Sequence, residues 1–371
     1  MPTRGNYDIA AYYWPAYHDE PRWRRFMPEG QGEWETIRKA VPKFPGHRQP
    51  RVPLWGYESE SDPRAMERKI AAAADHGVNV LIFDWYWYGG EPFLEDALDK
   101  GFLGAANNND RVKFFLMWAN HDATTLWDLE QSHEYKVIWP GMADRAAFDA
   151  VCDRVIERYF RHPSYYRIDG KPVFSIYEIG TLIKGLGGVE AARAALDAFR
   201  AKVAAAGLPG LHLQGVLWAN IPATLSMVPG DRTPTQGSTV GALGLDSLTN
   251  YQWCHYVRPR GEYRAWAEQA VAAWPRWAGE FSVPFFPHVS VGWDTNPRFK
   301  APKQDYVTGE TPELFGEYLR RALDFVDARK LHPRLVTVNA WNEWSEGSYL
   351  EPDTVVGMKY LEAVRDALGG A

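Results

Sequence analysis

The sequence predicts one domain, residues 1–371, with an α/β fold: a single (β/α)8 TIM barrel with elaborated βα loops at its C-terminal face. The chain is long enough for a large core, and 46% of its residues are hydrophobic. Short apolar or aromatic runs of strand length alternate with longer helical patterns, as in repeated βα units. Eight such runs occur, at residues 8–17, 78–88, 113–122, 171–180, 212–220, 246–254, 285–294 and 335–343.

The segments between these runs carry helix start and stop signals. Asp62 and Pro63 supply an N-cap and a first-turn proline before RAMERKIAAAADHG, and Gly77 stands where a helix C-terminus favours glycine. Thr311 and Pro312 repeat the start signal before ELFGEYLRRALDFVDARK. Further helices are predicted over 146–160, 188–206, 263–277 and 357–368, several with Ala and Leu at i, i+3 and i+4.

Three long segments do not fit the strands and helices of a minimal barrel. Such a barrel needs about 250 residues, which leaves roughly 120 for longer loops. The largest surplus, 18–61, follows the first run and is polar, Pro-rich and aromatic; smaller ones lie at 123–143 and 295–310. All three follow the carboxyl end of a predicted strand, where barrel enzymes build their active sites.

Charge and composition disfavour several classes of protein. Lys and Arg number 41 against 47 Asp and Glu, so the net charge of -6 gives no reason to expect a nucleic-acid partner. No apolar run is long enough for membrane insertion, and the N-terminus enters a strand pattern by Ile9 without a signal-peptide core. We therefore expect a cytoplasmic protein, although a chain trimmed of its leader would look the same. Cys152 and Cys254 lack the spacing of a zinc ribbon or a disulfide scaffold.

Aromatic and polar side chains gather where the predicted strands end. The chain has 17 Trp, 19 Tyr and 17 Phe, and nearly every run ends in a Trp or Tyr beside an amide or carboxylate. Rings of this kind combine an apolar face with a hydrogen-bonding group, as a sugar-binding surface requires. The alternative, that Trp only fills a large core, would scatter these residues along strands and helices. We predict a carbohydrate-binding cleft formed by Tyr13, Trp34, Asp84, Trp85, Trp118, Asn120, His121, Tyr177, Trp293, Asp294, Trp341 and Asn342.

The last strand offers a candidate catalytic pair, Glu343 and Glu346. Glycosidic cleavage needs one protonated and one ionised carboxyl group, and Trp344 between these two could raise one pKa by desolvation. An ExxE pair alone is weak evidence, because glutamates at a helix start look alike. Asp84 and Glu178 are the alternative carboxylates. We expect no metal, because the first strand ends in Tyr-Tyr-Trp and not in HxH, and no nucleotide cofactor, because no GxGxxG or P-loop occurs.

Four long motifs resemble the WbsX-like, or glycoside hydrolase family 99-like, proteins of bacterial polysaccharide loci, related to endo-α-mannanases and endo-α-mannosidases. They are AYYWPAYH near Ala11, GEWETIRKAVPKFPGHRQPRVP at 32–53, GWDTNPR at 292–298 and AWNEWSEGSYLEPD at 340–353. The resemblance implies that Glu343 acts as a base and Glu346 as the general acid/base. It also implies retention of configuration through a 1,2-anhydro sugar, which requires an axial 2-hydroxyl, as in mannose or rhamnose.

Two departures from the family pattern limit what can be carried over. Ser345 stands where family 99 has His, and His121 follows Trp-Ala-Asn where WbsX-like relatives commonly have an acidic residue. We therefore expect a glycoside hydrolase acting on an α-linked bacterial polysaccharide or oligosaccharide of undetermined sugar. The alternatives are a glycosyltransferase or transglycosylase in polysaccharide assembly, and a glycan-binding protein without catalysis.

Overall fold

Eight parallel strands form a barrel at the centre of the molecule. The computed structural model describes residues 6–108, 111–217, 221–224 and 235–369. Around the sheet the strands follow one another in chain order, and each lies within one of the eight predicted segments. They are β1 (Asp8–Tyr13), β2 (Val80–Tyr88), β4 (Lys113–Trp118), β8 (Lys171–Ile176), β9 (His212–Val216), β10 (Ser247–Thr249), β12 (His288–Ser290) and β14 (Leu335–Asn339).

The sheet closes on itself at its two ends. β1 pairs in parallel with both β2 and β14, with Tyr12 opposite Ile82 and Ala11 opposite Val338. A single bridge between Leu248 and Phe285 then joins β10 to the segment entering β12. The strands are buried on both faces, which explains why they appear in the sequence as nearly continuous apolar runs. The fold is therefore the predicted (β/α)8 TIM barrel.

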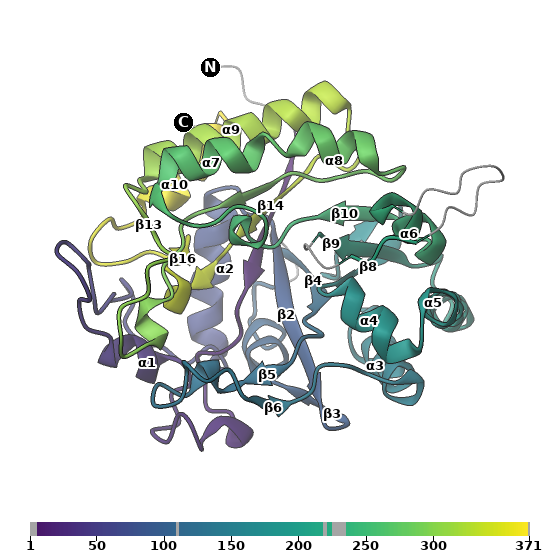
Figure 1. Cartoon of the computed structure of the whole chain (residues 1–371), viewed down its shortest axis with the longest axis horizontal. Helices are drawn as coiled ribbons and strands as arrows, with labels where there is room; N and C mark the ends of the chain where they lie inside the picture. The colour runs from purple at the N-terminus through teal and green to yellow at the C-terminus, as the bar shows by residue number, and fades with distance from the viewer. Residues whose placement is uncertain (1–5, 109–110, 218–220, 225–234, 370–371) are drawn as a thin grey trace.

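Helices surround the barrel, with α3 to α6 on one side and α7 to α10 along another in Figure 1. Asp62 accepts a hydrogen bond from Arg64 N, and Thr311 from Leu314 N, so both predicted start signals are confirmed. The helices are α2 (Pro63–Asp75), α3 (Arg145–Arg158), α4 (Ile179–Leu186), α5 (Val189–Ala205), α6 (Gln236–Leu243), α7 (Tyr263–Val271), α8 (Trp274–Glu280), α9 (Pro312–Arg329) and α10 (Lys359–Ala367).

Two connections differ from a regular α-helix. The helix predicted over 263–277 is broken into α7 and α8, because Pro275 has no N–H to continue the hydrogen-bond ladder and instead lies in the first turn of α8. After β2 the chain forms a π-helical turn, η2 (Ala97–Phe102). Buried apolar side chains from Tyr7 to Ala367 form one continuous core cluster. Among the described residues, no helix has the length and apolarity to cross a membrane.

The three surplus segments all lie at the carboxyl ends of barrel strands. The segment after β1 contains the short helices η1 (Pro21–Trp23) and α1 (Trp34–Lys39). The segment after β4 contains η3 (Thr125–Trp127) and the hairpin of β5 (Ala123–Thr124) and β6 (Val137–Trp139). The segment after β12 contains η5 (Asn296–Arg298) and β13 (Val307–Thr308), which pairs with β11 (Gly261–Glu262). The insertions after β4 and β12 contribute Thr124, Leu126, Trp127 and Arg298 to the wall of the site described next.

Candidate active site

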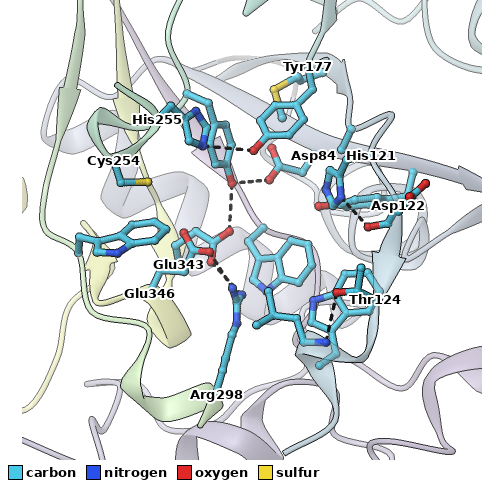
Figure 2. A pocket seen from close by; sticks show the side chains of 18 residues that line it. Asp84, His121, Asp122, Thr124, Tyr177, Cys254, His255, Arg298, Glu343 and Glu346 are labelled. Carbon is cyan, nitrogen blue, oxygen red and sulfur yellow. Dashed lines mark hydrogen bonds and ion pairs between the residues drawn. The ribbon is translucent and has the colours of Figure 1, made fainter. Parts of the chain in front are cut away.

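A cavity of about 350 Å³ lies at the carboxyl ends of the barrel strands. We call it the central cavity, and Figure 2 shows its side chains converging from many elements. Its lining is dominated by aromatic rings and by titratable groups, the composition that the strand ends predict. The lining residues are Trp14, Asp84, Tyr86, Met117, Ala119, His121, Asp122, Thr124, Leu126, Trp127, Tyr177, Tyr251, Cys254, His255, Trp293, Arg298, Glu343 and Glu346.

Glu343 and Glu346 reach the cavity from a tight hairpin after β14. The strands β15 (Asn342–Glu343) and β16 (Ser348–Tyr349) pair antiparallel, and the turn η6 (Trp344–Glu346) between them carries Glu346. Gly347 ends this turn at φ 63°, and a Cβ there would lie only 3.0 Å from Asp294 Cβ. Glycine therefore allows the hairpin to close against the 292–298 segment.

The carboxylate pair, Glu343 and Glu346, is almost removed from solvent. The side chain of Glu343 is 4% exposed and that of Glu346 is 13% exposed. Burial raises the pKa of Glu343 well above its ordinary value, and the neighbouring charge of Glu346 raises it further. Burial also raises the pKa of Glu346, while Arg298 opposes that rise. Two such groups cannot both ionise freely, so the pair titrates as a unit.

Arg298, from η5, is the cation that holds the pair. Its Nη1 donates to Glu346 Oε1 at 2.7 Å, and its Nη2 lies 3.5 Å from Glu343 Oε2. Its Nε donates to Glu33 Oε1 at 2.9 Å. The pKa of Arg298 is raised well above its ordinary value: burial opposes the rise, and Glu33, Glu346 and Glu343 cause it.

Glu33 is completely buried and is itself held by three donors. Besides Arg298, Trp14 Nε1 donates to Glu33 Oε2 at 2.7 Å and Ser345 Oγ donates to the same oxygen at 2.8 Å. Ser345 therefore ties the turn η6 to the segment after β1.

Tyr251 links Glu343 to a third carboxyl group, Asp84. Its hydroxyl oxygen lies 2.8 Å from Asp84 Oδ2 and 3.0 Å from Glu343 Oε1. In Figure 2, dashed lines mark these contacts where they reach Asp84 and Glu343. A phenol has one proton to donate, so it fully satisfies only one ionised carboxylate, whereas a protonated carboxyl group can itself donate to the phenol oxygen. Burial also raises the pKa of Asp84 well above its ordinary value. Both observations favour a proton on Asp84 or Glu343, in addition to the proton of the Tyr251 hydroxyl.

Histidines and aromatic rings form the opposite wall. Tyr177 OH lies 3.4 Å from His255 Nε2, and the rings of Tyr251 and His255 stack with centroids 5.8 Å apart. Burial lowers the pKa of His255 to about 3 and also lowers that of His121, so both rings are neutral at pH 7. Among the described residues, no three His, Cys, Asp or Glu side chains come together as a metal-binding group.

Of the residues predicted for the site, Glu343, Glu346, Asp84, His121, Tyr177 and Trp293 line the central cavity. Tyr13, Trp85 and Trp118 do not, because side chains alternate along a strand and these three point out of the barrel. Tyr13 OH donates to Glu60 at 2.8 Å, and Trp85 Nε1 donates to Glu95 at 2.9 Å. Trp118 packs against Phe148 of α3.

Five more predicted residues lie behind the cavity wall and support it. Trp34 is buried against Tyr17, and Trp341 is fully buried. The other three make hydrogen bonds that fix neighbouring loops: Asn342 with the backbone of Trp14, Asn120 with the backbone of Glu178, and Asp294 with His47 and Asn296. The predicted strand end Trp218-Ala219-Asn220 lies outside the described residues.

Arg298, Glu33 and Tyr251 belong to the site but were not among the residues predicted from the sequence. Arg298 and Glu33 belong to loops, so no strand periodicity could place them, although both lie inside the quoted motifs GWDTNPR and GEWETIRK. Tyr251 lies near the end of the predicted run 246–254, and its position next to an amide was the available signal.

Two solved structures share this fold. A protein described as glycoside hydrolase-like has 15% identity and a TM-score of 0.65, over 99% of this chain and 95% of its own. The family 99 endo-α-mannosidase of Bacteroides thetaiotaomicron, in complex with bis-tris-propane, has 15% identity and a TM-score of 0.58, over 97% of this chain and 96% of its own. At this identity the likeness concerns the fold.

Sequence comparison is more specific. The uncharacterized protein WxcX of Xanthomonas campestris pv. campestris is 28% identical over 373 residues, which cover 97% of this chain and 49% of WxcX. The chain thus spans about half the length of the curated relatives it matches. The sequence profile described as glycosyltransferase WbsX matches residues 9–364. Because this match covers nearly all of its length, the chain belongs to the WbsX family.

Proposed function

We propose that this chain is a glycoside hydrolase that cleaves an α-linked, mannose- or rhamnose-like bacterial polysaccharide or oligosaccharide. One observation carries the proposal: two buried carboxyl groups share a single arginine in an aromatic cavity at the C-terminal face of a barrel. Glycosidic cleavage requires such a pair, with one member protonated and the other ionised. The fold, which resembles that of a family 99 endo-α-mannosidase, supports this reading.

The proposed reaction has two steps. In the first, Glu346 protonates the leaving oxygen while Glu343 removes the proton of the 2-hydroxyl, so that O2 attacks the anomeric carbon and forms a 1,2-anhydro sugar. In the second, Glu346 takes a proton from water as the water opens the anhydro ring, and Glu343 returns its proton to O2. Both glutamates end in their starting states, and configuration is retained.

The ion pair with Arg298 determines where the shared proton resides before the reaction. Arg298 is hydrogen-bonded to Glu346 but lies 3.5 Å from Glu343, so it favours ionised Glu346 and a proton on Glu343. Catalysis in the proposed direction requires that proton to pass to Glu346 when the glycosidic oxygen enters. Arg298 therefore influences which glutamate carries the proton, and it also supports the structure of the site.

The second candidate function is transfer of a glycosyl group to a sugar acceptor. The description of the family as a glycosyltransferase favours it. The same pair would pass the glycosyl group to a sugar hydroxyl instead of water. A transferase would lengthen an added acceptor oligosaccharide, whereas a hydrolase would release reducing sugar with or without it.

The test is incubation of wild type, Glu343→Gln and Glu346→Gln with α-mannan, rhamnan and O-antigen polysaccharides, with products read by mass spectrometry. An amide keeps the side-chain shape but cannot exchange protons, so both variants should lose turnover and retain binding. Glu190→Gln, on the exposed face of α5, is the matched control and should behave as wild type. Wild-type rates in Glu346→Gln would refute the assignment.

A further inference from the structure

A second cavity, of about 340 Å³, lies beside the central one. We call it the side cavity, and it is formed by residues 44–51 after β1, 307–311 after β12 and 349–360 after β14. These segments all extend from the carboxyl ends of barrel strands, so the side cavity is on the same face as Glu343 and Glu346. The proposed reaction uses none of its residues.

Consecutive residues of one loop line the two cavities. Trp293 lines the central cavity and the next residue, Asp294, lines the side cavity. Asp294 N donates to Glu346 O at 2.6 Å, so this loop is bonded directly to the turn η6. The two cavities therefore adjoin at Trp293 and Asp294, beside the turn η6 that carries Glu346.

The floor of the side cavity is held rigidly by paired groups. His47 Nε2 lies 2.7 Å from Asp294 Oδ2. Arg51 Nη1 donates to Tyr349 OH at 2.9 Å, and that hydroxyl donates to Asp353 Oδ2 at 2.8 Å. These contacts fix the shape of the cavity and leave other groups available to a ligand.

The available groups are both donors and acceptors. Arg48 is exposed and has no hydrogen-bond or ion-pair partner within the described part of the chain. Glu310 has a side chain that is 25% exposed, and its one ion-pair contact among the described residues is Arg51 at 3.7 Å. Guanidinium groups donate and carboxylates accept, the combination that adjacent sugar hydroxyls satisfy.

The charges favour an uncharged ligand. Arg48 and Arg51 face Glu310, Asp294 and Asp353, so cations and carboxylates nearly balance and neither sign dominates. Asp353 is further occupied by the backbone N–H groups of Val355 and Val356. We infer that the side cavity is a second carbohydrate subsite, which binds a neutral sugar unit of the same glycan that reacts at the carboxylate pair. This inference rests on the proposed function and deepens it.

The inference predicts that substrate length matters. We would measure binding of α-manno- and α-rhamno-oligosaccharides, from disaccharide to hexasaccharide, to Glu346→Gln and to the double variant that also carries Arg48→Ala. The double variant should bind the longer oligosaccharides about tenfold more weakly, because a hydrogen bond to a charged donor is lost. The disaccharides should bind equally well to both. Arg64→Ala, an exposed arginine on α2 outside both cavities, is the matched control.

Val355→Trp gives an independent test that removes no charge. Val355 is 59% exposed and lines the side cavity, so a larger ring there fills space without disturbing the core. It should weaken the longer ligands as Arg48→Ala does. If the variants bind every oligosaccharide as tightly as Glu346→Gln does, the subsite inference is wrong. It is also wrong if the variants lose affinity equally for oligosaccharides of every length. Turnover by the wild type is measured separately, and absence of cleavage there counts against the proposed function. The dependence of affinity on oligosaccharide length tests the subsite.

Discussion

Glu33 and Arg298 form an ion pair inside the protein, 2.9 Å from Oε1 to Nε, although the two residues lie in loops after different strands. The same guanidinium reaches Glu346. Glu33 thus reduces the positive charge that the carboxylate pair experiences. In the proposed reaction, Arg298 without that compensation would favour the ionised form of both carboxyl groups, and the pair would lose its general acid.

Glu33→Gln should move the pH optimum of activity downward. The charge of Glu33 raises the pKa values of both Glu343 and Glu346, so its removal lowers them, and the acid loses its proton at a lower pH. The basic limb of kcat/KM should shift by about one pH unit. Glu35→Gln, in the first turn of the helix that Glu33 precedes, is the control. An unchanged profile, or a shift to higher pH, would contradict this role.

Asp84→Asn should make the protein more stable at pH 7 and less sensitive to pH. Burial raises the folded-state pKa of Asp84 above its unfolded value of about 3.9, so between these two values the folded state binds the extra proton. Stability from this group is therefore present at low pH and lost as pH rises through the folded pKa. The Asn variant has no carboxyl group to ionise, so its free energy of unfolding does not fall in this way as the pH rises. Urea unfolding at a series of pH values measures it, with the exposed Asp366→Asn as control.

Lys69→Met should destabilise the fold strongly. Lys69 Nζ lies 2.6 Å from Glu60 and 2.8 Å from Glu351, and all three side chains are buried. Removing the cation leaves two buried carboxylates without compensation, at a cost of about 3–5 kcal/mol. The loss should be smaller at acid pH, where the carboxyl groups protonate. Lys100→Met removes an exposed ion pair with Asp96 and should change the unfolding free energy by less than about 1 kcal/mol.

The barrel could be predicted from sequence because its signals are local. Each parallel strand is buried on both faces and appears as an apolar run, and residues such as Asp62 and Thr311 mark helix starts with their own side chains. The site was only partly predictable. A strand end delivers Asp84 to the cavity and, by alternation, directs Trp85 away from it. Arg298 comes from a loop whose path depends on tertiary packing.

Ser345 shows how one departure from a family pattern can be read physically. The residue is completely buried, and its hydroxyl donates to Glu33 Oε2. Ser345→Ala should lose that hydrogen bond, at about 1 kcal/mol, and keep most activity, because Trp14 and Arg298 still hold Glu33.

Ser345→His introduces the family 99 residue into a space built for a serine. The larger ring has to displace neighbouring groups, which costs about 1–3 kcal/mol in a packed interior, and it pushes Glu33 away from Arg298. We therefore expect the His variant to unfold at lower denaturant than the Ala variant, with the larger loss of kcat/KM. Measured side by side, a His variant as stable and active as wild type would mean that the space around Ser345 accepts the larger ring without displacing Glu33.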